Sequence, residues 1–338
     1  MRMKKTSKIL PLLLLVILLV SMVLAVSIGV VRIPMETIWQ LVKAQFGQAD
    51  TAGIPASYGI TLFQLRLPRI VMSVIVGAAL AACGCVFQSI FRNPICDPYV
   101  LGISSGSSLG GAISFILGWD VLYFGVTIPA LITGLLTLFV ILGISKMSRR
   151  RSIETLLLVG IAINFLISAV ITLLVVMHQR EMHKIYFWTM GSLASLSWSE
   201  VLMMSVMTII CVIPFFFYSK DLNIMQMGED VAKNLGVNTK RVAYVTLIFS
   251  SLLIATAVSC CGVIGFIGLI IPHVVRILFG NNMRTMFTYS LILGGFFLLI
   301  ADTLARTLAI PAELPVGSIT ALAGAPYFLF LLLRQKKV

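Results

Sequence analysis

The sequence predicts an all-α integral membrane protein of about ten transmembrane helices, for three reasons. Hydrophobic residues make up 59% of the chain and charged residues only 11%, whereas a soluble domain carries about 25% charged residues. The mean hydropathy is +1.06, so the apolar surface requires lipid as its solvent. The apolar residues also form separate runs of about 20, the length that crosses a ~30 Å bilayer core as a helix.

Ten such runs follow one another along the chain. The first has a basic start but continues beyond the roughly 7–15 apolar residues of a signal peptide, so we interpret it as a retained helix. The third and eighth are short and rich in Gly. The predicted spans, which form a single polytopic domain over residues 1–338, are 9–31, 68–90, 99–117, 121–145, 153–177, 198–218, 241–260, 262–280, 285–305 and 316–333.

The basic residues predict the topology. The net charge is +13, but these residues lie between apolar runs without interleaved aromatics, which argues against nucleic-acid binding. With both termini in the cytoplasm, 18 of the 25 Lys and Arg residues fall in inner segments and 7 in outer ones. The positive-inside rule therefore predicts cytoplasmic termini. The outer segments 34–47 and 178–196 are expected to hold small helices.

The one sizeable polar stretch on the inner side is 221–240. After Gly228, the carboxylates of Glu229 and Asp230 suit the first turn of a short helix. Gly236 suits the C-terminal cap of that helix. Ala232 and Leu235, three residues apart, would share a face able to enter a groove on a partner. An ordinary capped surface helix has the same local pattern.

A weak internal repeat connects the two halves of the chain. The second predicted helix contains Ala-Ala-Cys-Gly-Cys-Val-Phe at 81–87, and the seventh ends in Ser-Cys-Cys-Gly-Val-Ile-Gly-Phe at 259–266. An offset of five helices gives the two copies opposite orientations. The sequence therefore predicts an inverted repeat of helices 2–5 and 7–10, an arrangement common in transporters.

Residues that would power transport or catalysis are missing from the expected places. All twelve acidic residues fall in loops or at helix ends, whereas ion-coupled carriers place carboxylates inside the bilayer. No Gly-Lys dipeptide occurs, so a P-loop is excluded. The spacing of His178 and His183 fits no zinc motif, the six cysteines include no C-x-x-C pair, and we expect no metal site. Any ATP and magnesium would bind to a separate subunit.

Several ordered motifs over about 65–333 resemble the FecCD-type permeases, the membrane subunits of ABC importers for iron-siderophores, haem and cobalamin. The motifs are Leu-Arg-Leu-Pro-Arg at 65–69, Gln88 with Asn93-Pro94, Gly-Ile-Ser-Ser-Gly at 102–106, Trp-Thr-Met-Gly-Ser-Leu at 188–193, Gly265 to His273, Asp302 with Arg306, Glu-Leu-Pro-Val-Gly at 313–317, and Gly-Ala-Pro at 324–326.

The resemblance implies a type II ABC importer permease and not an enzyme, located in the bacterial inner membrane with no cofactor of its own. It implies a second permease copy, two cytoplasmic ATPases acting through 221–240, and a periplasmic or lipid-anchored substrate-binding protein. The expected substrate is a ferric chelate such as an iron-siderophore, with haem or cobalamin as the alternative. An ion-coupled secondary transporter is a more distant alternative.

Two further groups of residues have more than one interpretation. The resemblance implies that Arg66, Arg69 and Arg306 dock carboxylates of the binding protein. The alternative is that Arg306 pairs with Asp302 and the others anchor at head groups. A stripe of small residues allows either close helix packing or a polar pathway lining; its members are Gly102, Ser104, Ser105, Gly106 and Gly110.

Overall fold

The computed structural model describes residues 9–29, 33–48, 53–147, 153–194 and 196–334, and the regular secondary structure in these ranges is all helical, without a strand. The prediction of an all-α fold is confirmed. The elements are α1 Ile9–Ser27, α2 Met35–Gln45, α3 Ala56–Ile60, η1 Thr61–Arg66, α4 Leu67–Ile90, η2 Pro98–Leu101, α5 Ile103–Ile116, η3 Trp119–Val121, α6 Thr127–Met147, α7 Ile153–Met177, α8 Met182–Thr189, α9 Trp198–Phe217, α10 Ser219–Met225, α11 Glu229–Asn234, α12 Thr239–Cys261, α13 Ile267–Phe279, α14 Met283–Ala305 and α15 Val316–Arg334.

Each of the ten predicted spans contains one of the longer helices, and both predicted outer segments contain a short one, α2 and α8. Seven described helices are long and apolar enough to cross a membrane, and α13 and α15 are shorter apolar helices. The basic segments 1–8, 148–152 and 335–338 lie outside the described residues, as does the end of the first predicted span beyond residue 29.

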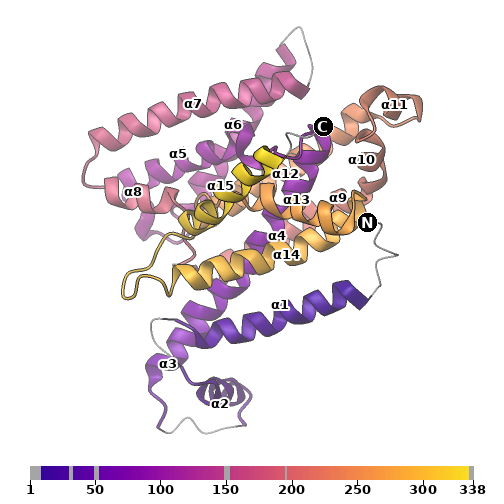
Figure 1. The fold of residues 1–338 in the computed structure, drawn as a ribbon. Coiled ribbons are helices and arrows are strands. Elements are labelled where there is room, and N and C mark those ends of the chain that lie inside the picture. The colour runs from indigo at the N-terminus through magenta and orange to yellow at the C-terminus, as the bar shows by residue number, and fades with distance from the viewer. Residues whose placement is uncertain (1–8, 30–32, 49–52, 148–152, 195, 335–338) are drawn as a thin grey trace.

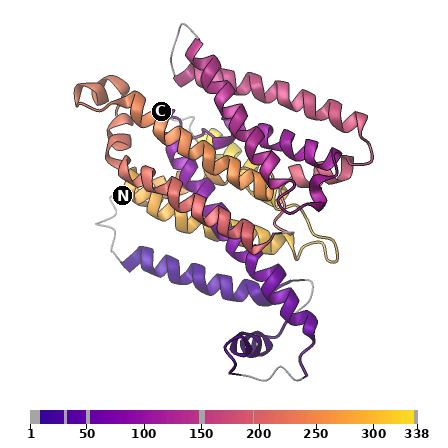
Figure 2. The same cartoon turned by 180° about the vertical axis from the view of Figure 1, so that it is seen from behind.

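The helices form a bundle around α4. From Pro68 onward most of α4 is buried, and it packs against α9, α12, α13 and α14. Helix α1 lies along one edge of the bundle and α7 along the opposite edge (Figures 1 and 2). Helices α10 and α11 lie at the end of the bundle where α1 begins, and α3 and α8 lie at the other end.

Glycines allow the helices around α4 to approach closely. A Cβ on Gly77 would lie 2.2 Å from the carbonyl oxygen of Gly294 in α14. A Cβ on Gly84 would lie 1.9 Å from the carbonyl oxygen of Gly268 in α13. In a membrane, where apolar contact alone gives no driving force for association, such close backbone packing is a main source of stability.

Besides the span predicted at 121–145, in which α6 begins only at Thr127, two predicted spans are only partly helical. The span predicted at 99–117 is broken at Gly102, which has a φ of +74°, between η2 and α5. The span predicted at 262–280 becomes helical only at Ile267, after Gly262 and Phe266 with φ angles of +68° and +69°. The hydropathy pattern missed both breaks because the non-helical residues are themselves largely apolar.

The two interrupted segments support the predicted inverted repeat. In each half of the chain a long helix, α4 or α12, is followed by an irregular connection and then a short helix, α5 or α13. The end of α4 and the beginning of α12 line one cavity at the same end of the bundle. The two long helices therefore run in opposite directions, as an inverted repeat requires.

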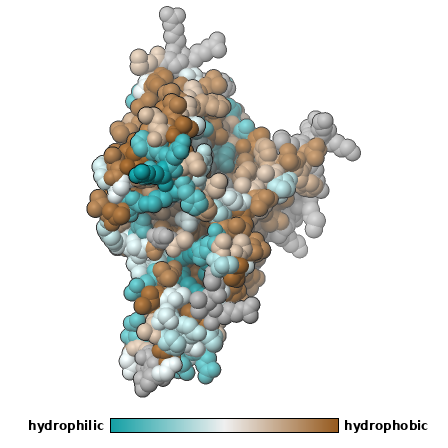
Figure 3. Space-filling model, turned by 90° about the vertical axis from the view of Figure 1, so that its left-hand side faces the viewer, coloured by the Kyte–Doolittle hydropathy of each residue, from teal (hydrophilic) through white to brown (hydrophobic). Residues whose placement is uncertain are grey.

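Figure 3 looks at the end of the bundle that carries α3 and α8. Hydrophilic residues gather in the middle of this surface, and hydrophobic residues flank them along the sides. The distribution fits a protein whose end meets water and whose flanks meet lipid.

Candidate functional site

The polar segment between α9 and α12 folds into two short helices, α10 and α11, at one end of the bundle. Gly228, with a φ of +132°, precedes α11, and Glu229 and Asp230 occupy its first turn. Lys233 Nζ lies 2.8 Å from Glu229 Oε1, one helical turn away. The hydrogen bond and the charge of Lys233 lower the pKa of Glu229 below its ordinary value.

The other end of α11 has the predicted glycine cap. The Gly236 N–H donates to the Lys233 carbonyl at 3.0 Å, and the Val237 N–H donates to the Ala232 carbonyl at 2.9 Å. Gly236 has a φ of +82°. These two bonds are the Schellman pattern, which satisfies carbonyls that the last helical turn leaves open. The chain therefore leaves α11 in a fixed direction.

The prediction that Ala232 and Leu235 share one exposed face is wrong. Ala232 is fully buried, whereas Leu235 is 63% exposed. Spacing along a helix cannot show which side faces the rest of the protein. The apolar surface that α11 and its approach expose consists of Met227, Val231 and Leu235.

At the opposite end of the bundle, the three arginines expected to dock a binding protein are buried. Arg66, Arg69 and Arg306 are only 6%, 6% and 3% exposed. Their charges are directed inward, toward α14 and the end of α1, so the prediction that they present free charges to a partner is corrected. The interpretation that pairs Arg306 with Asp302 is confirmed by a distance of 3.2 Å between Nε and Oδ2.

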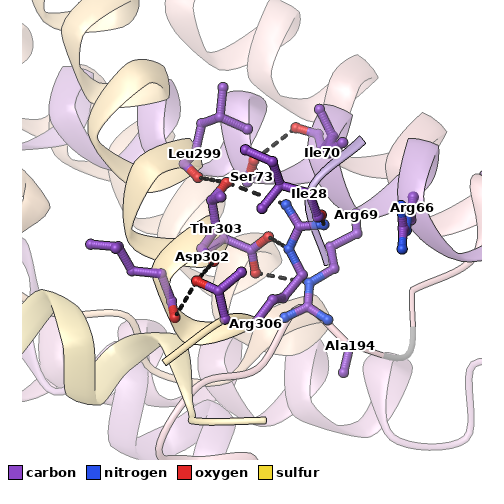
Figure 4. Close-up of polar contacts among 12 residues, drawn as sticks. Ile28, Arg66, Arg69, Ile70, Ser73, Ala194, Leu299, Asp302, Thr303 and Arg306 are labelled. Carbon is purple, nitrogen blue, oxygen red and sulfur yellow. Dashed lines mark hydrogen bonds and ion pairs between the residues drawn. The ribbon is translucent and has the colours of Figure 1, made fainter. Parts of the chain in front are cut away.

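Asp302, which is fully buried, lies at the centre of this charge cluster (Figure 4). Arg69 Nε donates to Asp302 Oδ1 at 2.8 Å, and Arg69 Nη1 donates to Glu313 Oε2 at 2.7 Å. The other two arginines reach the end of α1: Arg66 Nη1 donates to the Val26 carbonyl at 2.8 Å, and Arg306 Nη1 donates to the Ile28 carbonyl at 3.3 Å. The cluster thus joins α1, α4, α14 and the connection to α15.

The small-residue stripe of α5 supports the packing interpretation. A Cβ on Gly106 would lie 2.2 Å from Thr137 Oγ1, and one on Gly110 would lie 2.5 Å from the Pro129 carbonyl oxygen, both on α6. Gly102, the residue at the break, faces Gly160 of α7. Ser104 and Ser105 are each 8% exposed. The glycines therefore hold α5 against its neighbours.

Asp97 is a residue that the sequence reasoning missed. Its carboxylate accepts the Tyr99 N–H at 2.8 Å, which caps η2, and it also interacts with the backbone N–H of Phe266 just before α13. Pro98 packs against Gly268, and Gly268 in turn packs against Leu80 near the middle of α4. The N-terminal ends of η2 and α13 therefore meet at mid-depth, and Asp97 lies between them, where backbone N–H groups favour a carboxyl oxygen.

This position also corrects the expectation that every acidic residue lies away from the centre of the spans. Asp97 follows an irregular connection that turns back into the bundle, so a loop residue reaches the depth of the middle of α4. Its carboxyl group accepts from backbone N–H groups, which satisfies a polar side chain at that depth. Irregular backbone at such a depth is characteristic of transporters.

The interrupted helices, the inverted repeat and the short helices α10 and α11 at one end define a multi-pass membrane transport protein. The model of the FecCD transport family matches residues 17–334. The chain belongs to that family.

Relatives are similar over nearly the whole chain. The hemin transport system permease HmuU of Yersinia pestis is 36% identical over 96% of this chain and 95% of its own length. The cobalamin import system permease BtuC of Halobacterium salinarum is 37% identical over 89% of this chain and 80% of its own. A solved structure described as a metal-chelate type ABC transporter, inward-facing, has a TM-score of 0.83 and 31% identity, covering 97% of this chain and 100% of that chain. The chain is thus an ABC importer permease, like its relatives.

Proposed function

We propose that the chain carries a ferric chelate, such as an iron-siderophore, across the bacterial inner membrane. The complex contains two permease copies, two cytoplasmic ATPase subunits that bind ATP and magnesium, and a periplasmic or lipid-anchored binding protein. The names of the similar proteins support this substrate class. One relative is named for haem, another for cobalamin, and the solved structure for a metal chelate, and all of these are metal chelates. Haem and cobalamin themselves remain the alternative substrates.

The observation that carries the transport mechanism is the exposed apolar surface of α11. Met227, Val231 and Leu235 stand out from a helix fixed at its end by the Schellman bonds. A rigid helix with an exposed apolar face can enter a groove on a partner and transmit its movement. We therefore assign this surface to the ATPase, which drives the bundle between outward- and inward-facing states.

Replacing Leu235 by Glu is expected to weaken ATPase binding roughly tenfold or more, because a carboxylate would be buried in an apolar interface without a partner. The measurement is co-purification of the ATPase with the tagged permease. Leu308→Glu is the matched control, since Leu308 is 62% exposed at the other end of the bundle. Equal ATPase recovery from both variants would contradict the assignment.

Gly236→Val, which strains the cap, should reduce substrate-stimulated ATP hydrolysis.

The substrate is tested in proteoliposomes that contain the permease, its ATPase and its binding protein. Uptake of a radioactive ferric chelate, haem and cobalamin is compared with and without ATP. Uptake of the ferric chelate that requires ATP and survives a proton uncoupler supports the proposal. If only haem or only cobalamin is taken up, that compound is the substrate and the ferric chelate is not. Uptake that needs no ATP and stops with the uncoupler would indicate an ion-coupled carrier.

We expect cytoplasmic termini, because of the distribution of basic residues along the sequence. A single cysteine at Lys233 should react with an impermeant thiol reagent only from the cytoplasmic side. Single cysteines at Lys43 and Lys184 should react only from outside. The background is low because all six native cysteines are buried. The reverse labelling pattern would overturn this topology.

A further inference from the structure

A cavity of about 670 Å³ lies beside α11, between the ends of α4, α6, α7 and α12. Its wall is largely apolar and its rim is basic. The apolar wall is formed by Ile90, Phe91, Leu156, Leu157, Ala243 and Leu247. Helix α11 contributes only Glu229 and Lys233 to its edge.

The rim of the cavity has a positive charge. Glu229 on the rim is paired with Lys233 at 2.8 Å. The other three charged lining residues, Arg92, Lys146 and Lys240, are exposed and have no carboxylate partner within ion-pair distance among the described residues. All three line the same cavity, and the charges of Arg92 and Lys240 help to lower the pKa of Glu229 on its rim.

The cavity extends from the charged ends of the helices into the apolar part of the bundle. Thr239, the first residue of α12, and Leu247, two turns further on, both line it. Eight residues of helix correspond to a depth of about 12 Å. The site is therefore amphipathic along its depth, with cations at the mouth and apolar side chains below them.

We propose that this cavity binds an anionic phospholipid of the inner leaflet, a location that rests on the proposed topology. The phosphate lies at Arg92, Lys146 and Lys240, and an acyl chain lies along the apolar wall beside Leu157 and Leu247. Basic pockets between transmembrane helices on the cytoplasmic side have the chemistry to bind anionic headgroups. A free phosphate would use the cations alone and leave the apolar wall in contact with water.

The apolar depth also favours a lipid over an acidic surface of the ATPase. A protein carboxylate can meet the rim, but it would have to insert about two helical turns of apolar side chains to fill the space below. A phospholipid brings both parts in one molecule. Lipid bound here would lie between α7 and α12 and next to α11, so its headgroup would contact the helix that we assign to ATPase coupling.

The test measures lipid binding to the purified permease–ATPase complex after delipidation in detergent. Native mass spectrometry follows titration with dioleoylphosphatidylglycerol and, separately, with dioleoylphosphatidylcholine. We expect tight binding of the anionic lipid only. In the triple variant Arg92→Gln, Lys146→Gln, Lys240→Gln its affinity should fall roughly a hundredfold, because each cation near a membrane surface contributes a factor of about five.

A matched triple variant removes the same charge from the same end of the bundle. Lys220, Arg241 and Arg284 are exposed and do not line the cavity, so their replacement by Gln should change the affinity less than about twofold. Leu157→Trp fills the apolar wall and leaves the cations in place. It should weaken lipid binding while the thermal stability of the complex stays unchanged.

Four results would overturn the proposal. The two triple variants could lose affinity equally, which would indicate general surface attraction. Glycerol phosphate could compete as well as the whole lipid, which would indicate a simple phosphate site. Leu157→Trp could bind the lipid normally. The cavity triple variant could lose its ATPase while still binding the lipid, which would indicate a protein interface. None of these results depends on whether the transported substrate is a ferric chelate.

Discussion

Replacing Asp302 by Asn is expected to destabilise the folded chain by about 3–5 kcal/mol. Asp302 is the fully buried carboxylate that Arg69 and Arg306 share, at 2.8 Å and 3.2 Å. Asparagine has almost the same shape, so the substitution removes the charge and leaves the packing intact. Arg306 would then have no carboxylate within ion-pair distance among the described residues, and Arg69 would keep only Glu313. A buried charge without a partner is costly.

The measurement uses the native cysteines. All six are buried, so a thiol-reactive dye becomes fluorescent only as the solubilised protein unfolds on heating. Asp120→Asn is the matched control, because Asp120 forms a pair with the exposed Lys184 at 2.6 Å and such surface pairs contribute about 0–1 kcal/mol. If the Asp302 and Asp120 variants have the same melting temperature, the cluster does not stabilise the fold. If adding Arg306→Met to the Asp302 variant restores part of the lost melting temperature, the unpaired charge is the cause of the loss.

Signals that depend on neighbouring residues in the sequence predicted local structure well. The apolar runs located the long helices, and Gly236 after a polar helical segment predicted the cap of α11. Both rest on short-range physics: the length needed to cross a bilayer, and the freedom of glycine to adopt a positive φ. The side of α11 that faces the bundle depends on its packing, and Ala232 and Leu235 were assigned wrongly for that reason.

The charge cluster and the interrupted helices could not be predicted from the local sequence. Arg69 and Asp302 are 233 positions apart in the chain, and an arginine near a helix end has the same local pattern whether it faces water or a buried carboxylate. Likewise, the residues of 262–266 are mostly apolar although they form no helix. A signal was present in the repeated Gly-containing segments near 84 and 262, because glycine in a transmembrane run indicates either close packing or a break.

The second large effect is expected for Gly84→Ala, which should destabilise the chain by about 3 kcal/mol or more. A Cβ at this position would lie 1.9 Å from the Gly268 carbonyl oxygen and 2.6 Å from the Gly268 Cα. Both are backbone atoms, so no side-chain rotation can relieve the overlap. Helices α4 and α13 must move apart, and α13 would lose its position against Asp97 and Pro98. The dye assay and the yield of monodisperse protein measure the loss.

Gly143→Ala is the control for this prediction, since Gly143 also lies within a helix, α6, and no atom is within 4 Å of its added Cβ. Alanine there should leave stability unchanged or raise it by about 0.5–1 kcal/mol, because glycine loses more backbone freedom on folding. Comparing the two variants therefore separates the effect of close backbone packing on stability from the effect of helix propensity. If both variants melt alike, α4 and α13 are not held together by backbone contact. If only Gly84→Ala lowers the melting temperature, the backbone contact with α4 holds the short helix α13 in position.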